Sequence, residues 1–446
     1  MSKLIPCIVT RVVLAGASPA MAAGIELEEQ SAVAQGRVLA VRALLNDPST
    51  VFYNAAGLAY LDGFSFALGD TMAFPSFKYT DPAGVNPSSN TSNAVVPPPH
   101  AYAAYGMSLG GDSRLGVGLG VNIPFGLTLI WPEDFSGRHL VQESALMCPE
   151  ITLGAAYSPV KQVSIGAAFV ASPASVYLKR FLGQKFGLVG DDGQPIDDAF
   201  VEMAGAGWGF GFTAGIQVRP IDRLYLGLAY RSGISIEMEG DAHFEIPGLA
   251  DKSGFPDQKV ETKFELPDKL AFGIGYQILK AWYMEFDMDY AFWAVFDTIP
   301  LEFPEDTTGK LSQEIPEHWE GGFTFRLGNE FTVTDALTLR GGIGYDQNPI
   351  PDDYLSPMLP DSDRIFGSVG AGYKLDMGLR LDLAYELTHF RERTVHGTPC
   401  TADTPCTDDA GAELPEFKDD GSRNWVGNPF PANYQGMAQL LSVTVG

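Results

Sequence analysis

The chain has 446 residues, of which 45% are hydrophobic, 11% aromatic and 19% charged, and its formal net charge is −26. So large an apolar fraction excludes a disordered chain, and so acidic a balance argues against nucleic acid as a partner, because binding nucleic acid needs a basic face. A chain of this length forms either two or three soluble domains or one large barrel.

The first 22 residues have the features of an export signal. Lys3 and Arg11 supply positive charge, a short apolar run follows them, and the triplet AMA that ends at Ala22 has the A-x-A form of a cleavage site. We therefore expect a signal peptide over residues 1–22, with cleavage after Ala22. An ordinary N-terminal strand is the alternative.

Residues 23–62 differ from the rest of the chain, because they show helical patterning and turn signals and no alternation. From residue 63 to residue 446, apolar and polar residues alternate in segments of about ten residues or more, separated by loops rich in Pro, Gly, Asp and Asn. Fourteen such candidate strands start near Phe64, His100, Arg114, Leu140, Val163, Gly207, Leu224, Thr262, Trp282, Gly321, Leu337, Ile365, Leu379 and Tyr434.

An even number of long strands is what a closed antiparallel membrane barrel requires, since an open sheet edge in lipid would leave backbone groups unpaired. Loop lengths agree with this interpretation. The turn at 220–223 is tight, whereas the connections at 181–203 and 391–430 are long. Short periplasmic turns and long outer loops are typical of outer-membrane barrels.

The segment WYMEFDMDYAF, residues 282–292, shows the alternation clearly. Its apolar face carries Trp282, Met284, Phe286, Met288 and Tyr290, and its other face carries Tyr283, Glu285, Asp287 and Asp289. A basic residue that faces lipid at the midplane costs about 2–4 kcal/mol, and an acid somewhat less. We therefore expect the apolar face to meet lipid and the three acids to face the interior of the barrel.

Two glycine-rich segments, 116–121 and 207–215, imitate nucleotide-binding loops, but they lie inside alternating segments rather than between a strand and a helix. We interpret their glycines as small residues that let the barrel curve. The six histidines show no metal-ligand spacing, and no serine is obviously paired with one of them. We therefore expect no catalytic residue, no metal site and no cofactor.

Cys400 and Cys406 lie close together in a loop rich in Pro, Thr and Asp. An oxidising compartment would let them form a disulfide, and two free thiols are the alternative.

The third candidate strand contains the sequence VNIPFGL, with Asn122, Pro124, Phe125 and Gly126. Proline lacks the N–H that a strand donates, and a closed barrel has no free edge to place it on. We expect pairing to break here and the barrel wall to open locally. A strand end near the membrane interface is the alternative.

A second segment, VYLKRFLGQKFGL, places the cations Lys179 and Arg180 among apolar residues such as Phe181. Cations in an apolar pocket suit an amphipathic anion. The alternative is a basic strand end that reaches toward headgroups or lipopolysaccharide.

Four blocks occur in order along the chain: NDPSTVFYNAAGLAYL, VNIPFGL, WGFGFTAGIQVRPIDRLYLGLAYRS and GGIGYDQNPIPDDYLSPMLPDSDRIFGSVGAGYKL. Together they resemble the outer-membrane long-chain fatty acid transporter family, which also contains uptake channels for aromatic hydrocarbons. The resemblance covers essentially the whole mature chain. The first block departs from the usual N-P-A-G signature of the family, because Ala55 stands in place of the proline.

The resemblance implies a 14-stranded antiparallel transmembrane β-barrel over residues 63–446, plugged by a small, partly helical hatch over residues 23–62, in the outer membrane of a Gram-negative cell. It places Asn54, Ala55 and Gly57 in the hatch turn. It further implies that hydrophobic compounds are captured at the outer loops and pass without an energy source to a sideways exit.

The same resemblance makes Asn122, Pro124, Phe125 and Gly126 a lateral gate. It also places Arg180 where fatty acid transporters hold a carboxylate-binding arginine, with Lys179 and Phe181 as its neighbours in the substrate site.

One departure bears on the substrate: Pro300 stands where a second basic residue is expected, which favours a neutral hydrocarbon over a fatty acid. We expect a monomer in contact with outer-membrane lipid and lipopolysaccharide. A general porin for polar solutes and an outer-membrane lipid hydrolase are the alternative functions.

Overall fold

The computed structural model describes residues 25–92, 97–182, 188–249, 254–306, 311–376, 378–399, 406–407, 413–414 and 425–446. The expected signal peptide therefore lies outside the described residues. Among the described residues, no helix is long and apolar enough to span a membrane.

Strands dominate the molecule, and helices are few and short. The strands are β1 (Gly63–Thr80), β2 (Ser89–Asn90), β3 (Pro99–Gly110), β4 (Ser113–Ile130), β5 (Glu143–Val160), β6 (Val163–Phe181), β7 (Phe200–Ile221), β8 (Leu224–Arg231), β9 (Ile234–Glu245), β10 (Gln258–Leu266), β11 (Lys269–Leu279), β12 (Trp282–Ala291), β13 (Thr298–Glu302), β14 (Gln313–Pro316), β15 (Gly322–Thr332), β16 (Leu337–Asp346), β17 (Arg364–Lys374), β18 (Arg380–Pro399), β19 (Cys406–Thr407), β20 (Glu413–Leu414) and β21 (Trp425–Val445). The helices are α2 (Ala32–Gly36), α3 (Thr50–Tyr53), η1 (Ala55–Tyr60), η2 (Trp293–Val295) and η3 (Asp352–Tyr354).

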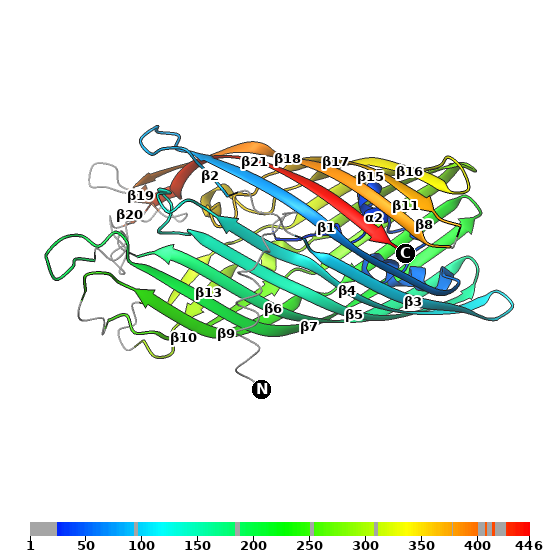
Figure 1. The fold of residues 1–446 in the computed structure, drawn as a ribbon, viewed down its shortest axis with the longest axis horizontal. Helices are drawn as coiled ribbons and strands as arrows, with labels where there is room; N and C mark the ends of the chain where they lie inside the picture. The colour runs from blue at the N-terminus through cyan, green and yellow to red at the C-terminus, as the bar shows by residue number, and fades with distance from the viewer. Residues whose placement is uncertain are drawn as a thin grey trace.

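The main sheet is a closed antiparallel ring of 14 strands, as the sequence predicts. β21 pairs with β1 from Leu68↔Val445 to Thr80↔Asn433, which joins the two ends of the sheet (Figure 1). Four strands of the ring consist of two segments each, namely β8 with β9, β10 with β11, β12 with β13, and β14 with β15.

Two strands begin earlier than the sequence predicts. β7 starts at Phe200 rather than near Gly207, and β21 starts at Trp425 rather than near Tyr434. Both early portions lie at the end of the barrel that carries the long loops (Figure 1). The outer face there is not uniformly apolar, so the alternation that marks a lipid-facing strand is weaker.

The breaks within the four divided strands coincide with a reversal of polarity. On β8 and β11 the outward face is apolar, as at Leu228 and Phe272, and Lys269 is buried on the inward face. On β9 and β10 the outward face carries charges, namely Glu237, Glu239, Asp241, Lys259, Glu261 and Lys263. Their inward face is apolar, with Ile236 and Met238 almost fully buried.

A lipid-facing wall must be apolar outside, whereas a wall in water is stable with charges outside and apolar residues within. We therefore infer that the hydrocarbon layer ends at the breaks, at residues 232–233 and 267–268 of β8–β9 and β10–β11. Beyond the breaks the barrel continues into water with an apolar interior.

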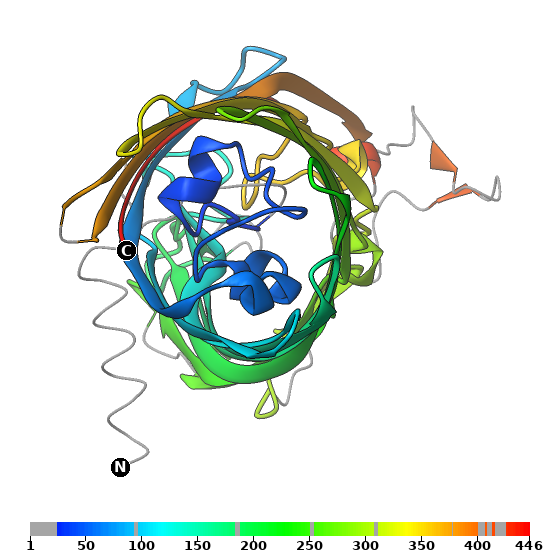
Figure 2. The same ribbon diagram turned by 90° about the vertical axis from the view of Figure 1, so that its right-hand side faces the viewer.

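The hatch, taken below as residues 25–62, fills the interior of the ring at the end where the chain terminates (Figure 2). Its η1 helix packs against the inner wall where glycines stand: a Cβ on Gly116 would come 2.1 Å from the Leu58 carbonyl oxygen, and one on Gly166 would come 2.5 Å from the Ala55 carbonyl carbon. The glycines of the 116–121 segment thus make room for the hatch, and their effect on the curvature of the wall stays a prediction.

The boundary at the breaks can be tested with a matched pair of arginine substitutions. We expect Phe272→Arg, on the lipid-facing side of β11, to lower the free energy of unfolding by about 2–4 kcal/mol, because it places a cation in hydrocarbon. Ser235→Arg, on the outward face of β9, should change it by less than about 0.5 kcal/mol. Urea unfolding in lipid vesicles measures both. Equal costs would show that the lipid does not end at the breaks.

Candidate functional site

The two faces of β12 lie as the sequence predicts. Its apolar residues point outward, with Phe286 the most exposed, and Glu285, Asp287 and Asp289 point inward. These three acids are at most 1% exposed, because the hatch and not open water occupies the interior at their level. Buried charges are unstable unless they are paired, so their partners determine what this part of the hatch can do.

Two of these acids bind the backbone of the hatch segment 37–43, called the arginine loop below. Glu285 accepts hydrogen bonds from Arg37 Nη2 at 2.6 Å and from the Ala43 backbone N–H at 2.6 Å. Asp287 accepts from the backbone N–H groups of Val41 at 2.8 Å and Arg42 at 3.0 Å. Strand β12 thus fixes both the path and a side chain of the loop.

The third acid belongs to a charge network that joins hatch and wall. Asp289 pairs with Arg42 at 2.8 Å and with Arg326 of β15 at 2.5 Å. On the hatch side, Glu28 pairs with Arg42 at 2.7 Å and with Lys269 at 2.7 Å. Glu28 also contacts Arg326. Each charge of this network that lies on the hatch therefore has a partner of opposite sign on the barrel wall, and each charge on the wall has one on the hatch.

The arginine loop holds a backbone conformation that such residues rarely adopt. Val38 and Leu39 have φ angles of 53° and 64°, in the left-handed region. For a β-branched residue this is strained, and a strained residue costs of order 1–3 kcal/mol and persists only when its surroundings determine it. Here the hydrogen bonds from the arginine loop to the acids of β12 hold the strained conformation in place.

The predicted hatch turn adjoins the same loop. Asn54 Oδ1 accepts from the Ala56 backbone N–H at 3.2 Å, and Asn54 Nδ2 donates to the Arg42 carbonyl at 2.9 Å. Ala55 is buried, and a Cβ on Gly57 would come 2.1 Å from Thr50 Oγ1. Asn54 thus caps η1, which contains Ala55 and Gly57, and its amide joins the start of this helix to the arginine loop.

Strand β4 loses its register at the predicted position. The pairing with β5 runs Asn122↔Glu150 and then resumes at Phe125↔Cys148, so β4 contains one residue more than its partner. An extra residue inverts the facing of all that follows, because side chains alternate with period 2. Phe125 and Leu127 consequently point inward and join the apolar interior.

The next ladder is interrupted at the same level. Pairing between β5 and β6 stops after Met147↔Ser175 and resumes at Ile151↔Ala171, which places Pro149 opposite Pro173. Two prolines that face each other supply no N–H groups for the ladder. Together with Pro124 of β4, they weaken the wall across three adjacent strands.

The N-terminal part of the hatch occupies the hydrogen-bonding groups that the kink, residues 122–126 of β4, leaves unpaired. Leu27 N–H donates to the Pro124 carbonyl at 2.6 Å, and Gly126 N–H donates to the Ile25 carbonyl at 2.9 Å. Gln30 bonds both backbone groups of Ile123, at 2.8 and 3.2 Å.

Asn122 shows that the kink is incompletely satisfied. Its side chain is fully buried, and neither amide atom has a hydrogen-bond partner among the described residues. A buried amide without partners costs roughly 1–3 kcal/mol. The kink is therefore a weak point of the wall.

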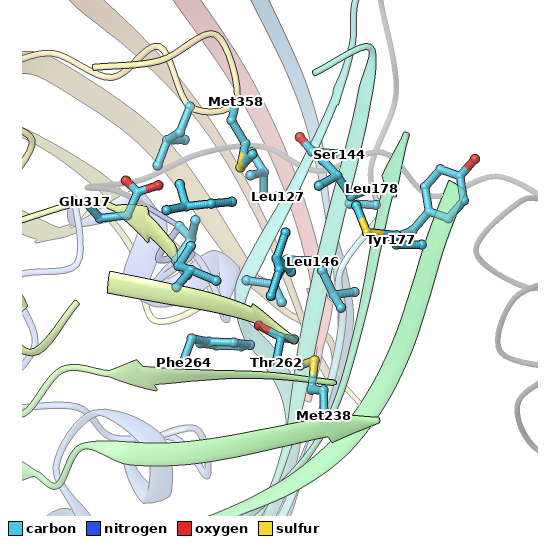
Figure 3. Close-up of a pocket in the computed structure, with 18 of the residues that line it drawn as sticks. Leu127, Ser144, Leu146, Tyr177, Leu178, Met238, Thr262, Phe264, Glu317 and Met358 are labelled. Carbon is cyan, nitrogen blue, oxygen red and sulfur yellow. The ribbon is translucent and has the colours of Figure 1, made fainter. Parts of the chain in front are cut away.

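A cavity of about 130 Å³ lies beyond the hatch, where the interior of the barrel is apolar (Figure 3). Leu127, Leu178, Met238 and Phe264 contribute to its lining, and Ile25 joins it to the N-terminal segment. An engineered apolar cavity of about 150 Å³ stays dry and binds benzene. A cavity of this size and lining therefore suits an apolar molecule.

The predicted substrate-binding residues are separated by the wall. Arg180 lies on the inward face of β6, two residues beyond Leu178, and its Nε has no partner among the described residues. Lys179 points to the opposite face, where it pairs with Glu202 at 3.3 Å and lies over the Phe200 ring. Phe181 packs against the Phe200 ring on that face as well. None of the three belongs to the cavity lining.

Sequence reasoning missed Glu317, which lines the cavity from the loop between β14 and β15, outside the strands. Trp319 Nε1 donates to its Oε2 at 2.8 Å. Burial raises the pKa of the Glu317 carboxyl to about 7, and the Trp319 hydrogen bond acts in the opposite direction. The available signal was the loss of alternation at PEHWEGG, residues 316–322.

The remaining predictions concern cysteines and metals. Cys400 and the side chain of Cys406 lie outside the described residues, so their disulfide stays a prediction. Cys148 is a buried free thiol. In the part of the chain that the structure describes, no group of three or more His, Cys, Asp and Glu side chains is arranged to hold a metal ion.

The pairing of hatch and wall can be tested at Arg37 and Glu285. We expect Arg37→Met to loosen the hatch, because it leaves a carboxylate buried without its cation, which typically costs 3–5 kcal/mol. Single-channel conductance in planar bilayers should rise. The double variant Arg37→Met/Glu285→Met removes both charges and should recover low conductance. If the single and double variants conduct alike, the ion pair does not hold the hatch.

Comparison with known proteins agrees with this geometry. The profile of a family described as "Outer membrane protein transport protein (OMPP1/FadL/TodX)" matches residues 13–445. The long-chain fatty acid transport protein of Salmonella typhi is 24% identical over 405 residues, which cover 85% of this chain and 90% of that protein.

Two solved structures share the fold. A FadL homologue of Pseudomonas aeruginosa superposes with a TM-score of 0.75 at 20% identity, covering 95% of this chain and 99% of that one. The toluene transporter TodX of Pseudomonas putida superposes with a TM-score of 0.66 at 17% identity, covering 95% and 99%. The chain therefore belongs to the OMPP1/FadL/TodX family, whose members are outer-membrane transporters of hydrophobic compounds and not enzymes.

Proposed function

We propose that this protein takes up hydrophobic compounds passively, by capture in the apolar cavity below the outer loops and by sideways exit into the membrane at the kink of β4. The observation that carries the proposal is the double role of the N-terminal segment. Ile25 lines the cavity, and its carbonyl accepts the hydrogen bond from Gly126 in the kink. One short segment therefore separates the bound molecule from the weak point of the wall.

Capture follows from the polarity of the upper barrel. A hydrophobic molecule that leaves water for an apolar cavity gains about 25 cal/mol for each Å² of apolar surface that is buried. The cavity is roofed by Ile350, Met358 and Leu359, from the loop between β16 and β17. A solute must pass this loop to reach the cavity, which makes it the proposed entrance.

Sideways exit is favoured because an apolar solute gains nothing from a watery pore. The hatch fills the ring below the cavity, so a direct route to the periplasm would require its removal. Exit at the kink requires a smaller rearrangement than removal of the hatch. Net hydrogen-bond energies in proteins are about 1 kcal/mol each, so release of Ile25 and Leu27 from β4 is a modest rearrangement provided that Glu28, the next residue, keeps its buried ion pairs with Lys269 and Arg326.

The substrate class follows from the charges near the cavity. Arg180 is buried on the inward face without a partner for Nε, and we propose that it receives the polar head of an amphipathic substrate. Pro300, which stands where the family resemblance predicts a second cation, uses its carbonyl to accept from Thr262 at 2.7 Å. One cation beside an apolar cavity suits neutral hydrocarbons as well as fatty acids. Relatives named for both substrate classes agree with this range.

We further propose the organisation of the mature chain. Cleavage after Ala22 would leave residues 23–62 as the hatch and residues 63–446 as the barrel, with Ile25 near the free end. A monomer surrounded by outer-membrane lipid and lipopolysaccharide is sufficient, since one chain closes the ring and supplies the cavity lining.

The lateral exit can be tested at Pro124. We expect Pro124→Val to slow the uptake of labelled toluene and oleate by about fivefold, because restoring one backbone N–H lets the wall pair more completely, a gain of about 1 kcal/mol. Uptake is measured in a strain that lacks its own transporter and expresses the variant.

Pro220→Val, at the end of β7, is the matched control and should leave uptake unchanged. Heat-modifiable mobility on gels confirms that both variants fold. Normal uptake by a folded Pro124→Val protein would count against exit at the kink.

A further inference from the structure

One acidic residue, Glu317, lines the otherwise mostly apolar cavity. Glu317 is 8% exposed and lines the apolar cavity, and among the described residues that line it there is no lysine or arginine. Figure 3 shows Glu317 on the side of the cavity opposite Ser144 and Leu178. An acid in this position is costly, which calls for a reason beyond the packing of an apolar chamber.

The local structure holds this carboxyl firmly. The Glu317 backbone N–H donates to the Asp297 carbonyl at 2.8 Å, and Trp319 Nε1 donates to Oε2. The Trp319 ring packs against Phe296 at 4.5 Å and Trp293 at 4.9 Å, between ring centroids. The donor is therefore itself fixed by two aromatic neighbours.

No cation neutralises the carboxyl within the described part of the chain, because Glu317 makes no ion pair there. The adjacent His318 is engaged with Asp297, at 2.5 Å between Nδ1 and Oδ1. A carboxylate has about four lone-pair positions, and Trp319 uses one of them. Glu317 retains capacity to accept a hydrogen bond from a molecule in the cavity.

A second polar group stands across the same cavity. Ser144 is 5% exposed, and its hydroxyl has no hydrogen-bond partner among the described residues. A buried hydroxyl without a partner costs free energy, and a bound hydroxyl group would satisfy it. Two buried groups on opposite sides of an apolar chamber, one an acceptor and one able to donate or accept, match a ligand that is apolar and carries an O–H group.

We propose that the cavity recognises neutral hydrocarbons that carry a hydroxyl group, such as alkylphenols or aliphatic alcohols, through an O–H hydrogen bond to the Glu317 carboxyl. This inference rests on the proposed uptake of hydrophobic compounds and narrows its substrate class. A carboxylate would be repelled from the same position by like charge. Arg180, which lies beyond the lining, is the separate contact for anionic heads.

The test compares three ligands that share a propylbenzene skeleton, on the full chain in detergent at pH 8: 4-propylphenol, propylbenzene and 4-propylbenzoate. Quenching of tryptophan fluorescence reports binding, because Trp319 and Trp293 adjoin the site. The wild-type protein should bind 4-propylphenol about tenfold more tightly than propylbenzene, a difference of about 1.4 kcal/mol, because only 4-propylphenol can donate a hydrogen bond to the Glu317 carboxylate.

Variants of Glu317 distinguish recognition of the hydroxyl group from a purely structural role of this residue. Glu317→Leu should abolish the preference for 4-propylphenol and leave propylbenzene binding within about twofold. Glu317→Gln keeps an acceptor and the Trp319 contact, so most of the preference should remain, and 4-propylbenzoate should bind more tightly than to wild type. Glu314→Leu, an exposed site on β14, is the control and should change nothing.

The possible results test this inference separately from the proposed uptake function. A preference that persists in Glu317→Leu, or equal weakening of all three ligands in that variant, overturns the proposal, since the second result means only a structural role for Glu317. A wild-type protein that binds none of the three ligands contradicts the proposed uptake function itself. Propylbenzene binding without any preference for 4-propylphenol leaves the uptake function standing and rejects this inference alone.

Discussion

The structure depends on the hydrogen bonds and ion pairs that three carboxylates of β12 make with the hatch. Glu285, Asp287 and Asp289 project into the barrel from β12, and each binds the arginine loop through its side chains, its backbone or both. Water cannot hydrate these acids once the hatch is in place, so their charges must be balanced by groups of the hatch and of the neighbouring strands. The same bonds hold Val38 and Leu39 in a strained conformation. The hatch is therefore held by its centre and by Glu28, which leaves the residues that precede Glu28 as the part that can move with the least disturbance.

The second organising feature is the reversal of polarity along the barrel. Below the breaks the wall is apolar outside and charged inside, and the charges anchor the hatch. Above the breaks it is charged outside and apolar inside, and the apolar interior forms the cavity. The bulge at Pro124 belongs to the same pattern, because its extra residue turns Phe125 and Leu127 inward. Interrupted strands thus build a chamber with an apolar lining directly above a plug held by charge.

Much of this architecture could be predicted from the sequence, because a lipid-facing strand imposes strict alternation. The faces of β12, the number of strands and the interruption at Pro124 all follow from that constraint and from the chemistry of proline. The partners of the inward acids could not be predicted, since Arg37 and Arg42 lie about 250 positions away in the chain. Lys179 and Arg180 were grouped in one substrate site because they are adjacent in sequence, but the opposite facing of Lys179 shows that neighbours in sequence need not share a site.

Glu317 was missed for a related reason. It lies in a break between strands, where no period assigns a side chain to the interior or to solvent, and an acid there is usually exposed. Likewise, the glycines at 116–121 suggested curvature of the wall, and only the position of η1 showed that they make room for the hatch. Sequence patterns thus predict the wall well and the contents of the barrel poorly.

The central claim is that the N-terminal segment closes the kink of β4 and must leave it for transport. Ile25 and Gly126 lie opposite each other beside the Glu26↔Phe125 bridge, and hydrogen-bonded residues opposite each other in antiparallel strands have Cα atoms about 5.5 Å apart, within the range of a disulfide. The most direct measurement is uptake of labelled hydrocarbon by cells expressing Ile25→Cys/Gly126→Cys in a Cys148→Ala background, before and after reduction. The account predicts slow uptake when the bond is formed and recovery when it is reduced. Equal uptake in both states, with the bond verified by mass spectrometry, would contradict it.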